Sequence, residues 1–141
     1  MKINKDKKYL AQPCAHVPEY DFGRVAIILK REMLRLGDRA VGLAANQISL
    51  NYRAFAMKHE GKIIVFINPT ITDKWGDEII LKEKCLSLKK EFKVKRYMYI
   101  RVKDDYQTQG MTMALTNFSA QVFQHEMDHI NGITIETRSQ K

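Results

Sequence analysis

Apolar residues recur at intervals of three and four positions in two parts of the chain, one near each end. From about Tyr20 to Leu36 they approximate one face, and Gly37 follows as a stop signal, so we predict an amphipathic helix there. The second segment precedes Gly132 and carries apolar residues on more than one face. This pattern predicts a helix that is buried on several sides.

Between these two helices, apolar runs and alternating residues predict β-strands. Two of the runs are joined through His59-Glu60-Gly61, which is typical of a hairpin connection. The predicted strands are residues 54–57, 63–67, 78–81, 97–102 and 112–115. This order of elements predicts an α+β fold, with antiparallel strands around a central C-terminal helix and an N-terminal amphipathic helix. A chain of 141 residues is expected to form a single domain, 1–141.

The composition excludes several classes of protein. Hydrophobic residues make up 45% of the chain, as in ordinary globular proteins, and no apolar run is long enough to cross a membrane. The first residues contain lysines but no apolar segment, so no secretory signal is expected. Two cysteines are too few for a disulfide scaffold. These features favour a cytosolic, reducing setting.

The C-terminal helix carries the sequence with the clearest chemical content. Residues 125–129 read H-E-M-D-H, and on a helix His125 and His129 lie one turn apart on the same face. Both imidazoles can therefore reach one metal ion, and Glu126 can act as a general base toward water held there. Buried histidines and a buried glutamate need such a reason, because buried charge is costly unless it is paired or metal-bound.

A catalytic metal site of this kind needs a third protein ligand. The residues alone leave several candidates open, namely Cys14, His16, His59, Cys85 and the carboxylates. They also leave open two other functions. One is an endopeptidase that uses the same H-E-x-x-H pair. The other is a metal-stabilised RNA-binding module without enzymatic activity, which the excess of basic residues favours.

Three segments, taken together, resemble the motifs of the peptide deformylase family. In order along the chain they are AVGLAANQ at 40–47, EKCLS at 83–87 and QHEMDHING at 124–132. Ala40 and Lys84 depart from the pattern, because the family has glycine at both positions. The chain given ends nine residues after Gly132, where many bacterial members continue into another helix. It is therefore similar to the minimal forms carried by some phages.

The resemblance implies a metal-dependent hydrolase that removes the N-formyl group from the formyl-methionine of nascent peptides. The implied metal ligands are Cys85, His125 and His129. The implied ion is iron(II) in cells, with zinc(II), nickel(II) or cobalt(II) as substitutes. Glu126 is then the general base. Gln47 and the backbone N–H of Leu86 are the expected donors to the developing oxyanion.

Substrate positions are expected in two places. The small-residue run that begins with Gly42, Leu43 and Ala44 leaves room for a substrate strand to pair through backbone hydrogen bonds. Phe118 and Val122 lie one or two turns before the first motif histidine on the same helix face. We expect these two side chains to line the pocket for the methionine side chain.

Further expectations concern the roles of other charged and aromatic residues near the motifs. In the family, the acidic residue of the second motif pairs with a downstream arginine, here Glu83 with Arg96. Asp128 is expected to orient a ligand histidine or to be structural. Trp75 is expected to pack against the protein rather than to recognise a ligand.

The net charge of +8 concentrates partly between Lys82 and Lys103, where lysine and arginine far outnumber glutamate. This stretch fits a solvated strand face, or a transient contact with the ribosome through its RNA. Formylmethionyl nascent peptides are the expected partners, and no association with a membrane is expected. The expected location is the cytoplasm of a bacterial cell, or of its host if a phage carries the gene.

Overall fold

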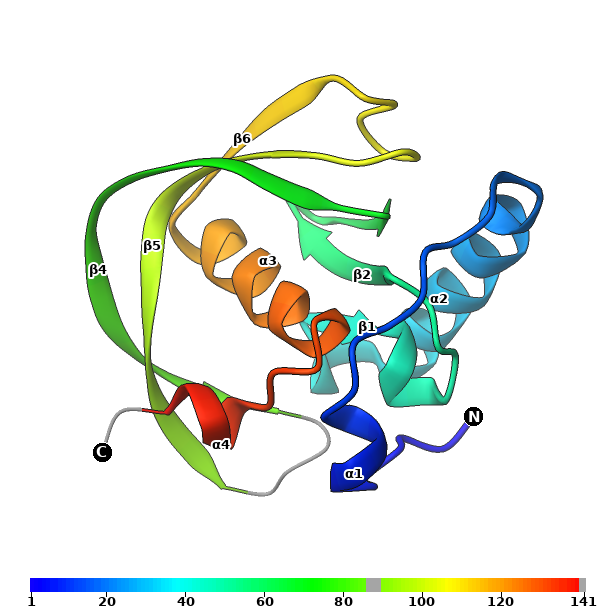
Figure 1. Ribbon diagram of the computed structural model, residues 1–141, viewed down its shortest axis with the longest axis horizontal. Helices are drawn as coiled ribbons and strands as arrows, with labels where there is room; N and C mark the ends of the chain where they lie inside the picture. Colours follow the sequence, from blue (N-terminus) through cyan, green and yellow to red (C-terminus); the bar gives the residue numbers. More distant parts are fainter. Residues whose placement is uncertain (86–89, 140–141) are drawn as a thin grey trace.

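The computed structural model describes residues 1–85 and 90–139. Two three-stranded antiparallel sheets lie on either side of one long helix, α3 (Figure 1). The first sheet has the order β1-β2-β3, with bounds Gly42–Ala44, Ala54–His59 and Lys62–Ile67. The second has the order β4-β5-β6, with bounds Thr70–Lys84, Glu91–Lys103 and Thr112–Thr116. The helices are α1 (Lys7–Leu10), α2 (Phe22–Leu36), α3 (Asn117–Ile130) and α4 (Ile135–Arg138), and 3-10 turns occupy Glu19–Asp21, Gly37–Arg39 and Ala45–Ile48.

Helix α2 packs on the first sheet and forms a core with it. Its fully buried Leu29 and Met33 lie in one apolar cluster with Val65 and Ile67 of β3. The helix ends at Gly37, whose φ of 57° is a left-handed conformation that favours glycine. The amphipathic pattern therefore located this helix correctly, and residues 19–21 form a 3-10 turn ahead of it rather than its first turn.

Helix α3 forms a second core with both sheets. The ring of Phe123 meets Phe55 and Phe66 of the first sheet edge-on, with centroids 5.0 and 4.9 Å apart. Ile100 of β5 and Leu115 of β6 complete the same cluster from the second sheet. Apolar residues on more than one face of the helix are thus explained by contacts on more than one side, as the sequence predicts.

The second sheet contains much longer strands than the sequence suggests. The predicted segments 78–81 and 97–102 are parts of β4 and β5, which pair antiparallel over most of their length and curve around α3 (Figure 1). Most of β4 is exposed, so its sequence shows little alternation between apolar and polar residues. The pairing is interrupted by a register shift between Trp75 and Glu78, which adds a further local irregularity.

The structure confirms the α+β fold class and the antiparallel sheets. It adds three short elements, α1, β1 and α4, that are too short to give a periodic signal. Within the part of the chain that the structure describes, no helix is both long and apolar enough to span a membrane.

Candidate active site

Three side chains, two of them on α3, converge on one side of this helix. Cys85 directly follows β4, while His125 and His129 lie one turn apart on the helix. Their possible ligand atoms all lie within 4.8 Å of one another, and Sγ of Cys85 is 3.2 Å from Nε2 of His129. A thiolate with two imidazoles suits zinc(II) or iron(II). The residues present therefore fit one divalent metal ion.

The other candidates for a third ligand lie elsewhere. Cys14 is buried in the α3 core, and burial raises its pKa to about 11. His16 is next to Asn68, and Nδ1 of His59 is 2.8 Å from the hydroxyl of Ser119. Among the described residues, the one cluster of three possible ligands is the cysteine-histidine-histidine group.

A carboxylate orients the first of the two histidines. Burial raises the pKa of Glu83, but hydrogen bonds from Arg96 and His125 outweigh it and lower this pKa to about 2. Because the carboxylate is ionised, it accepts, and Nδ1 of His125 donates to Oε1 of Glu83 at 2.7 Å. The other ring nitrogen, Nε2, is then left for a metal, which is the usual arrangement for a ligand histidine.

The two imidazoles differ in their protonation. Burial lowers the pKa of His125, but hydrogen bonds to Cys85 and Glu83 and the charge of Glu126 outweigh it and raise this pKa to about 10. Burial holds the pKa of His129 well below its usual value, and the charge of His125 adds to the effect. A cation entering the cluster would therefore displace a proton from His125 and meet a neutral His129.

A chain of alternating charges fixes Glu83 in place. Arg96 donates two hydrogen bonds to Glu83, at 2.8 and 2.9 Å, and a third to Asp128 at 2.6 Å. Arg138 of α4 donates to both oxygens of Asp128, at 2.9 and 3.2 Å. The predicted pairing of Glu83 with Arg96 is present. Among the described residues, Asp128 contacts neither histidine through its side chain and holds the two arginines instead.

Glu126 lies between the two histidines and close to the backbone of β1. Its Oε1 is buried and has no hydrogen-bond partner among the described residues. A Cβ on Gly42 would lie 2.5 Å from its Oε2, so the carboxylate needs a glycine beside it. Burial raises the pKa of Glu126 to about 7, with the charge of His125 opposing the effect. A carboxyl group with such a pKa can both accept and return a proton near neutral pH.

Gln47 is held with its amide group facing the cysteine. Its Oε1 accepts a hydrogen bond from the backbone N–H of Ala44 at 3.0 Å, and its Nε2 lies 3.5 Å from Sγ of Cys85. Next to it, the side chain of Asn46 donates to the backbone oxygen of His129 at 2.8 Å. The expected second donor, Leu86, lies outside the described residues.

A pocket of about 410 Å³ opens over these groups. Gly42, Gln47, Cys85, His125 and Glu126 line it, together with Phe118, Gln121 and Val122 of α3 and with Asp38, Arg39, Lys82 and Lys84. Leu43 and Ala44 do not line the pocket, because their side chains are fully buried in the two cores. Of the three residues expected to receive the substrate strand, Gly42 is therefore the one that lines the pocket.

Known proteins match the chain over its length. A family described as Polypeptide deformylase matches residues 2–141. The chain belongs to the peptide deformylase family. A relative from Desulforudis audaxviator is 38% identical over 120 residues, covering 82% of this chain and 76% of the relative. A peptide deformylase from Wolbachia pipientis of Culex pipiens is 35% identical over 109 residues, covering 66% of this chain but 60% of its own length.

Solved structures of the family have the same fold. The enzyme from the Vibrio parahaemolyticus bacteriophage VP16T, in complex with actinonin, has a TM-score of 0.85 at 32% identity. The match covers 96% of this chain and all of the phage chain. The peptide deformylase from Thermotoga maritima has a TM-score of 0.84 at 27% identity, covering all of this chain and 97% of its own. The family is thus shown by sequence and by structure.

Sequence reasoning missed one contact and one residue of the site. The contact of Glu83 with His125 joins residues that are 42 positions apart. The family motif predicts only the pairing of Glu83 with Arg96. Arg138 was missed because it lies in a four-residue helix after the last motif. A signal was available, because a buried Asp128 needs a cationic partner and Arg138 lies nine positions after the H-E-x-D-H run.

Proposed function

We propose that this chain removes the formyl group from the N-terminal formyl-methionine of nascent peptides, with one divalent metal ion held by Cys85, His125 and His129. The observation that carries the proposal is the convergence of these three ligand atoms beside a pocket that Cys85, His125 and Glu126 line. Three protein ligands leave one position free for a reactant, which is typical of a catalytic rather than a structural metal site.

Glu126 is the proposed general base and acid. When bound, the metal ion lowers the pKa of a coordinated water and polarises the formyl oxygen. Glu126 takes the proton of the attacking water and returns it to the nitrogen of the leaving amine. Its Oε1, which has no hydrogen-bond partner among the described residues, and its raised pKa support both steps.

Gln47 and the backbone N–H of Leu86 are the proposed donors to the oxygen that becomes negatively charged. The hydrogen bond from the Ala44 N–H to Oε1 of Gln47 orients the amide so that its NH2 group donates toward Sγ of Cys85, at 3.5 Å. Donors that are fixed before the reaction stabilise the transition state without reorganisation.

The substrate is proposed to lie along β1. The backbone of Gly42, Leu43 and Ala44 forms the edge strand next to the pocket and pairs on its other side with β2. Phe118, which is 56% exposed, and Val122 form the proposed wall for the methionine side chain.

The proposed ion in cells is iron(II), with zinc(II), nickel(II) or cobalt(II) as substitutes. A thiolate beside iron(II) is open to oxidation by air. Protein loaded with iron(II) should therefore lose activity faster in aerated buffer than protein loaded with nickel(II). Equal lifetimes would contradict this choice of ion.

Elemental analysis combined with release of formate from formyl-Met-Ala-Ser under anaerobic conditions tests the function. We expect about one metal ion per chain and formate release in wild type, and loss of both in Cys85→Ser. Metal retained in full by Cys85→Ser would point to the endopeptidase alternative, which does not need the cysteine. Metal binding without hydrolysis of any formyl peptide would point to a structural site.

The proposed place of action is the cytoplasm of a bacterial cell or of a phage host, where formylated nascent chains arise. A transient contact with the ribosome through the basic surface belongs to the same proposal. Cosedimentation of the protein with ribosomes at low and high salt tests it, because contacts with phosphates weaken as salt rises.

A further inference from the structure

The β4–β5 hairpin has one face turned toward α3 and one turned away. Val94, Ile100 and Val102 of β5 are fully buried against the interior. Successive side chains of a strand alternate between faces, so the exposed Lys93, Lys95 and Tyr99 of this strand belong to the opposite face. We call this side of β4 and β5 the outer face; no described helix or strand covers it (Figure 1).

One end of the outer face holds four lysines in a small area. Lys82 lies directly opposite Lys93 in the pairing of the two strands. Lys84 and Lys95 are the next residues on the same face, where Lys84 lies opposite Glu91 and Lys95 opposite Ile80. Like charges directly opposite each other destabilise a sheet. None of these four lysines forms a salt bridge with another described residue. Their repulsion would be relieved by an anionic partner.

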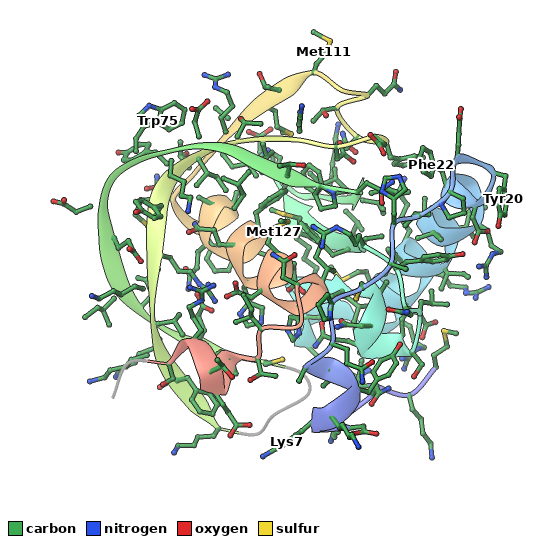
Figure 2. All side chains as sticks on the ribbon, in the orientation of Figure 1. Lys7, Tyr20, Phe22, Trp75, Met111 and Met127 are labelled. Carbon is green, nitrogen blue, oxygen red and sulfur yellow. The ribbon has the colours of Figure 1, made fainter. Side chains whose placement is uncertain are left out.

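The other end of the outer face holds exposed rings. Trp75 lies directly opposite Tyr99, and the two side chains are 45% and 51% exposed. The guanidinium of Arg101 lies over the Trp75 ring, 5.6 Å from its centroid. Figure 2 shows Trp75 pointing outward from the hairpin. About half of the Trp75 surface is therefore open to a partner, and the expectation that this tryptophan serves packing stays a prediction.

We propose that the outer face binds single-stranded RNA. Phosphates would neutralise the opposed lysines, and unstacked bases would lie on the rings of Trp75 and Tyr99 and on the Arg101 guanidinium. An anionic membrane fits less well, because Asp73 lies opposite Arg101 and Glu78 lies next to the rings. Sinking the rings into lipid would bring both carboxylates against the anionic headgroups.

Two residues of the outer face, Lys82 and Lys84, border the catalytic pocket, and the rest of the face leads away from it. Glu83, which contacts His125, is buried on the inner face of β4. Lys93, Lys95 and Tyr99 do not line the pocket over the cluster. Substitutions at Lys93, Lys95 and Tyr99 should therefore change RNA binding without changing formyl hydrolysis, and either function can fail without the other.

The chain contains a single tryptophan, so its fluorescence reports on Trp75 alone. The probe is a twelve-residue oligouridylate, titrated into metal-loaded protein at low and high salt. We expect quenching of the fluorescence and binding that weakens as salt rises, because counterions are released from the phosphates. Absence of quenching, or quenching by phosphatidylglycerol vesicles but not by RNA, would overturn the proposal.

Two matched pairs of substitutions distinguish binding at the outer face from general attraction of RNA by the net positive charge. Lys93→Gln combined with Lys95→Gln should weaken RNA binding at least fivefold and reduce the salt dependence, with formyl hydrolysis unchanged. Lys30→Gln combined with Arg31→Gln removes the same charge from exposed positions of α2 and should leave binding within twofold of wild type. Equal weakening by the two pairs would mean that charge alone attracts RNA, and would contradict the proposal.

The rings have their own test. Tyr99→Ala should weaken binding of the oligouridylate by about 5- to 100-fold, since stacking of one base on one ring contributes on the order of 1–3 kcal/mol. Inorganic polyphosphate, which has charge but no bases, should bind wild type and Tyr99→Ala equally. An unchanged RNA affinity in folded Tyr99→Ala protein would show that the rings take no part.

Discussion

The backbone of Gly42 lies against the carboxylate of Glu126. A Cβ at this position would be 2.5 Å from Oε2 of Glu126 and 3.1 Å from Cγ1 of Val122. Both neighbours are buried on α3, so they have little room to move. The glycine thus permits an approach between β1 and α3 that no other residue allows.

We expect Gly42→Ala to lower kcat/KM for formyl-Met-Ala-Ser by about a hundredfold, because a shift of about 1 Å in a reacting group can have that effect. Metal content should stay at the wild-type level, since Gly42 is not among the ligand residues. Gly23→Ala on α2 is the control, because a Cβ there meets no atom within 4 Å. Full activity in Gly42→Ala would show that the carboxylate has another position available.

Glu126→Ala should keep its metal and its fold, while its kcat falls by about two to four orders of magnitude, which is the usual contribution of a general base. Gln47→Ala should lose less, mainly in kcat. Metal analysis, circular dichroism and formate release on the same preparations check these outcomes. More than a tenth of the wild-type rate in Glu126→Ala would exclude it as the base.

Asp128→Asn should destabilise the protein by about 3–5 kcal/mol, because it leaves the buried Arg96 with one carboxylate in place of two. Arg138→Gln should cost less than about 1 kcal/mol, since the Arg138 side chain is 42% exposed and its ion pair is screened by water. Urea unfolding measures both free energies. A larger loss of unfolding free energy in Arg138→Gln than in Asp128→Asn would show that the ion pair with α4 stabilises the protein more than the ion pair with Arg96.

Asp21 gives a pH dependence of stability that is independent of the metal site. Hydrogen bonds from Arg24, then from Tyr52, lower the pKa of Asp21 to about 2. Since the unfolded chain has an ordinary pKa of about 4, the stabilisation is complete above pH 4 and is lost as the pH falls to 2. The melting temperature of wild type should therefore exceed that of Asp21→Asn at pH 6, and the difference should shrink toward pH 2. A constant difference would show that Asp21 is not ionised when folded.

The sequence predicts the parts of the molecule that have a local signal. The α2 and α3 helices follow from apolar periodicity, and the cluster of Cys85, His125 and His129 follows from three motifs of a known family. The full length of β4 does not, because an exposed strand that pairs mainly with its neighbour needs no alternation of apolar residues. Contacts such as Glu83 with His125 depend on the path of the whole chain, which no single segment encodes.

The proposed site also has a consequence for how the protein folds. Its contacts join residues far apart in the chain: 83 positions from Asn46 to His129, 44 from Cys85 to His129 and 38 from Gln47 to Cys85. Such contacts form late and slowly, because long loops must close first. During synthesis, β1 and β4 leave the ribosome before α3 does, and domains complete their folding only when all their parts are present. The metal cluster can therefore assemble only after α3, which carries two of its ligands, has left the ribosome.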